Sequence, residues 1–191
     1  MAIVFILLPA CSSTNKPPTI KYYLLDLPPE FSTFASKQFN KNLVKVNRAD
    51  LPDYLEQPNL VIREDNQQIR IANYHSWADN LGESIRRVLI NNLNAKNNNY
   101  NFVKECKDCA NLKISIEHFY PTNDGKVVLI GIYSIEKMTA TKKGETFSER
   151  FMLSQDIQID GYDHAVKKMS ELLSQLSEQM TQNITITIRQ Q

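Results

Sequence analysis

Residues 112–118 read LKISIEH, and this short stretch decides much of the fold. Apolar and polar side chains alternate along it, and this period of two predicts a strand with one buried face and one solvated face. A turn over residues 121–125 follows, and residues 127–133 are apolar on both faces, as in a central strand. Residues 147–159 alternate again. The second half of the chain is therefore predicted to form an antiparallel meander.

The first half of the chain contains shorter β-branched and aromatic stretches that are typical of strands. They cover residues 20–27, 42–47, 59–63 and 68–71. The last two are separated by a polar turn, so they are predicted to pair as a hairpin.

Helical periodicity marks residues 77–94. Ser76 and Asp79 are spaced like a capping box, which predicts the start of this helix. Gly82 is unfavourable inside a helix, so it indicates a close approach of the helix to its sheet.

A second long helix is predicted over residues 163–182, where an apolar stripe recurs at helical spacing. Such a stripe is typical of core packing and does not indicate a cofactor site. Residues 183–188 alternate Asn-Ile-Thr-Ile-Thr-Ile, which is compatible with an additional edge strand. The expected fold class is mixed α/β, bordering α+β, with one twisted mixed sheet of about five to seven strands and two long helices.

The amino-acid composition argues against some classes of function, nucleic-acid binding among them. The chain has 191 residues, is 42% hydrophobic and 23% charged, and carries a net charge of +1. These values are those of an ordinary globular domain and offer no basic stripe for nucleic acid. The sequence has no Gly-rich phosphate-binding motif, and no cofactor is expected.

The N-terminus resembles a bacterial lipoprotein signal. Residues 1–10 are almost entirely apolar and end in Leu-Pro-Ala before Cys11, the predicted site of acylation. Residues 11–19 are then a polar tether and residues 20–191 a single domain. An apolar run of about ten residues is too short to span a bilayer, which needs roughly 20. The alternative is a buried N-terminal strand with an incidental cysteine.

Cys106 and Cys109 are the chemically suggestive pair of the chain. In an oxidising compartment they are predicted to form a structural disulfide. Free thiols and a redox-active pair remain alternatives, although the motif leads into a strand and a reactive cysteine favours a helix N-terminus. His75, His118 and His164 are dispersed and fit no metal or nucleophile motif, so no metal ligands and no catalytic residues are assigned.

Pro52 and Pro58 bracket a short segment that is predicted to be a rigid, irregular connection. Within it, Tyr54 and Leu55 either pack on the core or present an apolar surface to a partner. In the second case Tyr54→Ala would weaken partner binding with little loss of stability. Trp77 is expected to cover the strand ends, with partner contact as the alternative.

Several of these segments together resemble the ABC-type transport auxiliary lipoprotein family, the PqiC-like proteins. The similarity is carried by residues 45–63, 73–81 and 85–89, by the Tyr-Tyr-Leu strand at 22–24 and by Cys11. The Cys106–Cys109 motif is not part of the family pattern.

The resemblance implies a three-layer arrangement and a non-enzymatic lipoprotein on the periplasmic face of the outer membrane. It also implies work with an MCE-domain protein in moving lipids between membranes, in support of envelope integrity. We expect a homo-oligomer anchored to outer-membrane lipid through acylated Cys11. The alternatives are a periplasmic thiol–disulfide protein that uses Cys106 and Cys109, and an envelope lipoprotein that acts as a scaffold or binds a small ligand.

Overall fold

The structure is a computed structural model that describes residues 18–25, 42–65, 67–96, 99–139 and 142–189. The predicted signal peptide and Cys11 lie outside these residues, as does the tether up to residue 17. The described elements, in chain order, are β1 (Lys21–Tyr23), β2 (Asn42–Val46), α1 (Asp53–Glu56), β3 (Asn59–Arg63), β4 (Ile69–Trp77), α2 (Leu81–Lys96), β5 (Tyr100–Val103), β6 (Ala110–Pro121), β7 (Lys126–Thr139), β8 (Lys142–Asp156) and α3 (Tyr162–Arg189).

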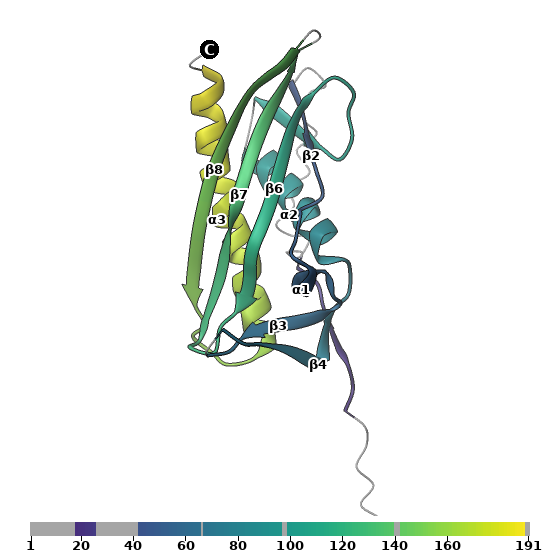
Figure 1. Ribbon diagram of the computed structural model, residues 1–191, viewed down its shortest axis with the longest axis vertical. Coiled ribbons are helices and arrows are strands. Elements are labelled where there is room, and N and C mark those ends of the chain that lie inside the picture. Colours follow the sequence, from purple (N-terminus) through teal and green to yellow (C-terminus); the bar gives the residue numbers. More distant parts are fainter. Residues whose placement is uncertain (1–17, 26–41, 66, 97–98, 140–141, 190–191) are drawn as a thin grey trace, which may run out of the picture.

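The expected mixed α/β class is confirmed, and the strands divide between two sheets (Figure 1). The larger sheet has the order β5-β2-β6-β7-β8 and the smaller one the order β1-β4-β3. β2 pairs in parallel with both β5 and β6, and β1 pairs in parallel with β4. The remaining neighbours are antiparallel. Both sheets are therefore mixed.

The predicted meander is confirmed as β6, β7 and β8, joined in antiparallel register. Buried Leu112, Ile114 and Ile116 of β6 alternate with exposed Lys113 and Ser115, as the sequence pattern requires. The hydrogen-bonding register shifts between Ile116 and His118, where a β-bulge interrupts the ladder. β6 and β7 extend beyond the predicted stretches at both ends, whereas β8 begins earlier than predicted and ends at Asp156, before residue 159.

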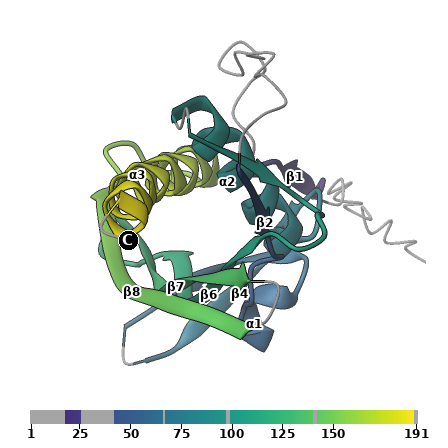
Figure 2. The same ribbon diagram turned by 90° about the horizontal axis from the view of Figure 1, so that it is seen from above.

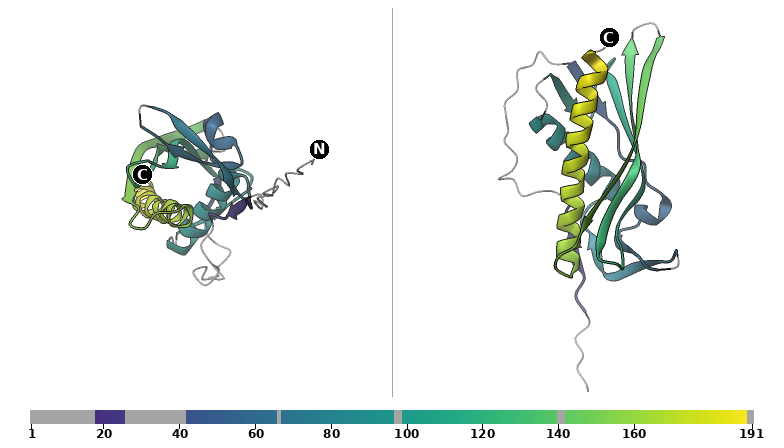
Figure 3. Two further views of the ribbon diagram at one scale, coloured as in Figure 1. Left: turned by 90° about the horizontal axis from the view of Figure 1, so that it is seen from below. Right: turned by 90° about the vertical axis from the view of Figure 1, so that its left-hand side faces the viewer.

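The two long helices lie beside each other along one face of the larger sheet (Figure 2). Figure 3 shows α3 running along nearly the full length of the long strands. The predicted stripe of α3 is buried, as expected for core packing. Its members are Ala165, Met169, Leu172, Leu173, Leu176 and Met180, and each is at most 3% exposed.

The predicted start of the first long helix is wrong. Ser76 and Trp77 belong to β4, which is paired through these residues with Tyr22 and Tyr23 of β1. The helix α2 begins at Leu81, and Asn80 is its cap: the Glu83 amide donates to Asn80 Oδ1 at 3.2 Å. A hydroxyl at Ser76 has the chemistry of a cap, but sheet pairing takes precedence over this local signal.

The predicted edge strand at residues 183–188 is also wrong, because α3 continues through these residues to Arg189. Asn183 Nδ2 donates to the Tyr133 hydroxyl at 3.0 Å and also to Glu149 Oε2. This contact holds the helix against β7 and β8 at the point where the alternating sequence begins. Helix propagation from a packed segment outweighs the strand preference of Ile and Thr.

Candidate functional site

The segment between Pro52 and Pro58 contains one turn of helix, α1, and not only irregular backbone. Leu55 is 3% exposed and joins the core. Tyr54 is partly buried, and its hydroxyl donates to the Glu117 carbonyl at 2.6 Å. Burial raises the pKa of the Tyr54 hydroxyl to about 12, so the group stays protonated and remains a donor. Tyr54 thus fastens α1 to β6.

Replacing Tyr54 is therefore expected to reduce stability, contrary to the expectation for an exposed side chain. Tyr54→Phe should lower the free energy of unfolding by about 1 kcal/mol, because the Glu117 carbonyl loses its donor. Tyr54→Ala should cost about 2–3 kcal/mol, less than for a fully buried ring. Urea unfolding measures both, with exposed Asp53→Ala on the same turn as control. Stabilities within about 0.5 kcal/mol of the parent for all three variants would show that the ring does not pack.

Trp77 is 7% exposed and lies at the end of β4. Its amide donates to the Pro58 carbonyl at 2.7 Å, so it connects the end of the proline-bracketed segment to the smaller sheet. The three residues predicted for partner contact consequently do not form one exposed patch. Leu55 and Trp77 offer a partner little surface, and a contact through Tyr54 stays a prediction.

Arg48 connects α1 to the start of α2, an arrangement that sequence spacing did not reveal. Its guanidinium donates to Glu56 Oε2 at 2.5 Å and to Asn80 Oδ1 at 3.0 Å. The hydrogen bond from Arg48 holds the pKa of the Glu56 carboxyl below its ordinary value. Because the Arg48 and Glu56 side chains are 38% and 33% exposed, solvent screens the pair, and we assign it a role in positioning and only a small one in stability.

The predicted close approach at Gly82 is confirmed, although its neighbour is the loop after β2 and not the sheet itself. A Cβ built at Gly82 would lie 2.8 Å from the Ala49 carbonyl oxygen. Gly82 therefore lets α2 lie directly on the segment that carries Arg48.

A groove of about 430 Å³ crosses the face of the larger sheet that points away from α2 and α3. Outward residues of β6, β7 and β8, among them Lys113, Ser134 and Ser148, line it together with Arg48 and Asp50. This lining has neither a histidine nor a cysteine, and within it Ser115 Oγ donates to Asp50 Oδ2 at 3.2 Å. Its hydroxyls and charges can bind polar groups.

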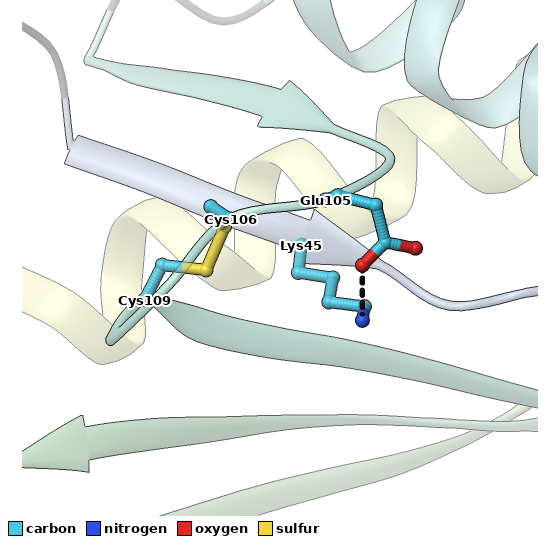
Figure 4. Close-up of a disulfide and its surroundings, with 4 residues drawn as sticks. All are labelled: Lys45, Glu105, Cys106 and Cys109. Atoms are coloured by element: carbon cyan, nitrogen blue, oxygen red, sulfur yellow. Dashed lines mark hydrogen bonds and ion pairs between the residues drawn. A yellow bond between two sulfur atoms is a disulfide. The ribbon is translucent and has the colours of Figure 1, made fainter.

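Cys106 and Cys109 form a disulfide in the connection between β5 and β6. This connection crosses β2, to which both strands are paired, and its Glu105 forms an ion pair with Lys45 of β2 (Figure 4). Both cysteines are partly buried and neither lies at a helix N-terminus, the position that favours a thiolate. The surroundings match a crosslink that closes a turn.

Removing the disulfide is expected to lower stability moderately and to leave function intact. The crosslinked loop is short, so the chain-entropy model gives a loss of about 2 kcal/mol for a Cys106→Ser/Cys109→Ser variant. Mass analysis without reductant should find the pair bridged in the parent, and urea unfolding measures the loss. A folded double variant without any activity would favour the redox hypothesis.

His75 and His118 take part in separate contacts. The Tyr23 hydroxyl and His75 Nδ1 are 2.7 Å apart, and the His75 ring stacks on Tyr162 at 3.6 Å. His118 Nδ1 is 2.9 Å from the Tyr120 hydroxyl. Among the described residues, no three His, Cys, Asp or Glu side chains are grouped so that they could hold a metal ion. Within the same residues, no helix is long and apolar enough to cross a membrane.

Comparisons with known proteins agree on one family. The model of the ABC-type transport auxiliary lipoprotein component matches residues 23–181. The intermembrane transport lipoprotein PqiC of Escherichia coli (strain K12) is 27% identical over 188 residues, which cover 96% of this chain and 95% of that protein. PqiC of Shigella flexneri matches to the same extent.

Two solved structures share the fold. The crystal structure of an uncharacterised protein, 26% identical, superposes with a TM-score of 0.75 over 87% of this chain and 99% of that one. A Xanthomonas campestris protein, 13% identical, gives a TM-score of 0.65 over 90% of this chain and 98% of that one. The family match runs from the last residue of β1 through the proline-bracketed segment and α2 to most of α3, and the chain accordingly belongs to the ABC-type transport auxiliary lipoprotein family.

Proposed function

We propose that this protein is a non-enzymatic component of an MCE-type intermembrane lipid transport system, anchored to the periplasmic face of the outer membrane through acylated Cys11. The observation that carries the proposal is the family match over residues 23–181, together with the likeness to PqiC along nearly the whole of both chains. The MCE-domain partner and the outer-membrane location are more specific than the family match, and the experiment below tests them.

The geometry supports an accessory role. The polar groove on the larger sheet offers hydroxyls and charges that can bind polar groups, and the disulfide lies in a strand connection. A protein of this kind would contribute a rigid body that holds a partner at the membrane. We further propose that it acts as a homo-oligomer.

The experiment tests partner and function together. The acylated full chain is crosslinked in intact cells, captured from the envelope, and the captured proteins are identified by mass analysis. We expect enrichment of an MCE-domain protein, and we expect deletion of the gene to sensitise cells to detergent unless the parent chain is restored.

One control variant and two contradicting outcomes complete the experiment. The exposed-site variant Asp53→Ala should behave like the parent in capture and in detergent resistance. If the acylated protein is captured from the outer membrane and no MCE-domain protein comes with it, the partnership is contradicted. If the acylated protein is found in the inner membrane, the outer-membrane location is contradicted.

A further inference from the structure

Exposed apolar side chains of the described residues gather on the smaller sheet. Ile20, Tyr22 and Leu24 are 46%, 67% and 56% exposed, and Tyr74 of β4 is 46% exposed. These four residues are named the β1 patch. Monomeric proteins rarely leave neighbouring apolar side chains in water unless the surface binds something.

The backbone of β1 places the patch on one side of the sheet. Side chains alternate along a strand, so Ile20, Tyr22 and Leu24 point away from buried Tyr23 and Leu25. β1 is paired with β4 at Lys21 and His75, and one step earlier in this parallel register Ile20 lies beside Tyr74. The four side chains therefore form one continuous surface.

The strand that carries the patch is firmly held. The Ala78 amide donates to the Tyr23 carbonyl at 2.8 Å, and Ser170 Oγ of α3 donates to the Leu25 carbonyl at 2.7 Å. The Tyr23 hydroxyl and His75 Nδ1, 2.7 Å apart, add a side-chain contact on the buried side. Because these bonds fix the orientation of β1, its outward side chains cannot turn into the core.

We infer that the β1 patch rests on the phospholipid surface that holds acylated Cys11, an inference that rests on the anchoring proposed above. Cys11 precedes Ile20 by nine residues. At about 3.3–3.6 Å per residue, even a fully extended chain keeps the patch within ~30 Å of the acylated residue. The β1 patch is thus the apolar surface closest in sequence to the anchor.

The chemistry of the patch fits a membrane interface. Tyrosine prefers the headgroup level, where its ring is in an apolar environment and its hydroxyl is hydrated, and Ile and Leu reach further toward the acyl chains. β1 has only three residues, which gives a partner strand few main-chain groups to pair with. The patch also lies toward the end of the molecule opposite the C-terminal end of α3 (Figure 1), so the long strands would extend away from the membrane.

The test uses environment-sensitive labels on the acylated full chain. Cys106 and Cys109 are bonded to each other and Cys11 carries the lipid, so a newly introduced cysteine is the single free thiol. Tyr22→Cys and Tyr74→Cys are labelled with a nitrobenzoxadiazole dye. Met152→Cys is the matched control, because Met152 is 71% exposed on β8 of the larger sheet. Each protein is reconstituted into phosphatidylethanolamine–phosphatidylglycerol vesicles, with and without phospholipids that carry a quencher near the headgroup.

The expected result is a blue shift at positions 22 and 74 on reconstitution, with loss of emission when the lipid quencher is present, and neither change at position 152. Unfolding midpoints of the unlabelled variants should match the parent, because the replaced side chains are exposed.

Three results would overturn the inference, and flotation of the vesicles distinguishes them. If the protein floats with the vesicles but the dye at position 22 shows no change, the anchor is supported and the lipid contact of the patch is refuted. A blue shift that lipid quenchers do not affect shows that protein, such as a second copy of the chain, covers the patch. Protein that fails to float shows that Cys11 is no anchor, and this result removes the proposed anchoring as well.

Discussion

Gly131→Ala is expected to destabilise the protein severely, although it adds only one methyl group. A Cβ at Gly131 would lie 2.3 Å from the Ser115 carbonyl oxygen, 2.8 Å from Phe151 Cζ and 3.0 Å from Ile116 Cα. Two of these atoms belong to the backbone of β6, which cannot move without disturbing the centre of the sheet. Overpacking typically costs about 1–3 kcal/mol, and because backbone must shift we expect a loss of about 3 kcal/mol or more.

The location explains why glycine is required. Gly131 pairs with Ile116 at the bulge in β6 and with Phe151 of β8 on its other side. A glycine inside a strand is typical of such close backbone approaches, and the Phe151 ring fills the space that its missing side chain leaves.

Urea unfolding checks this prediction. Ile132→Ala, at the next position of β7 where the side chain is 40% exposed, is the control and should cost far less. An unfolding free energy of Gly131→Ala within about 0.5 kcal/mol of the parent would show that β6 and β7 are further apart than the structure has them.

Cys11→Ser is expected to have the largest effect on function. Serine cannot form the thioether that carries the lipid, so acyl labelling should disappear and the chain should either stay unprocessed or leave the membrane fraction. Each buried CH₂ of an acyl chain contributes about 0.8 kcal/mol, and two or more chains are needed for a stable anchor. Loss of the cysteine thus removes the proposed lipid anchor in one step, and the exposed side chains of the β1 patch do not replace it.

Labelling with a fatty acid analogue, followed by fractionation, measures the effect. The Cys106→Ser/Cys109→Ser variant is the matched control, because it removes two cysteines and leaves the proposed acylation site. It should be labelled like the parent. Equal labelling of Cys11→Ser and the parent would contradict the lipoprotein hypothesis.

The sequence by itself determined those features that depend on near neighbours along the chain. Alternation over residues 112–118 predicted a half-buried strand, and the stripe from Ala165 to Met180 predicted the buried face of α3, because strand and helix periods place side chains directly. Gly82 similarly indicated a close approach. The family resemblance was also visible in the sequence alone, mostly in residues between 45 and 89, and the family match confirms it.

Where a segment had the local preferences of both a helix and a strand, only the tertiary structure decided which one it forms. Ser76 can cap a helix or extend a strand, and pairing of β4 with β1 selects the strand. Residues 183–188 have strand preference, yet they continue α3, which is packed on the sheet and bonded to Tyr133 and Glu149 through Asn183. The division into two sheets, the burial of Leu55 and Trp77 and the exposure of the β1 patch likewise depend on contacts between residues far apart in sequence. Periodicity specifies which side of an element is apolar, whereas long-range packing specifies what that side meets.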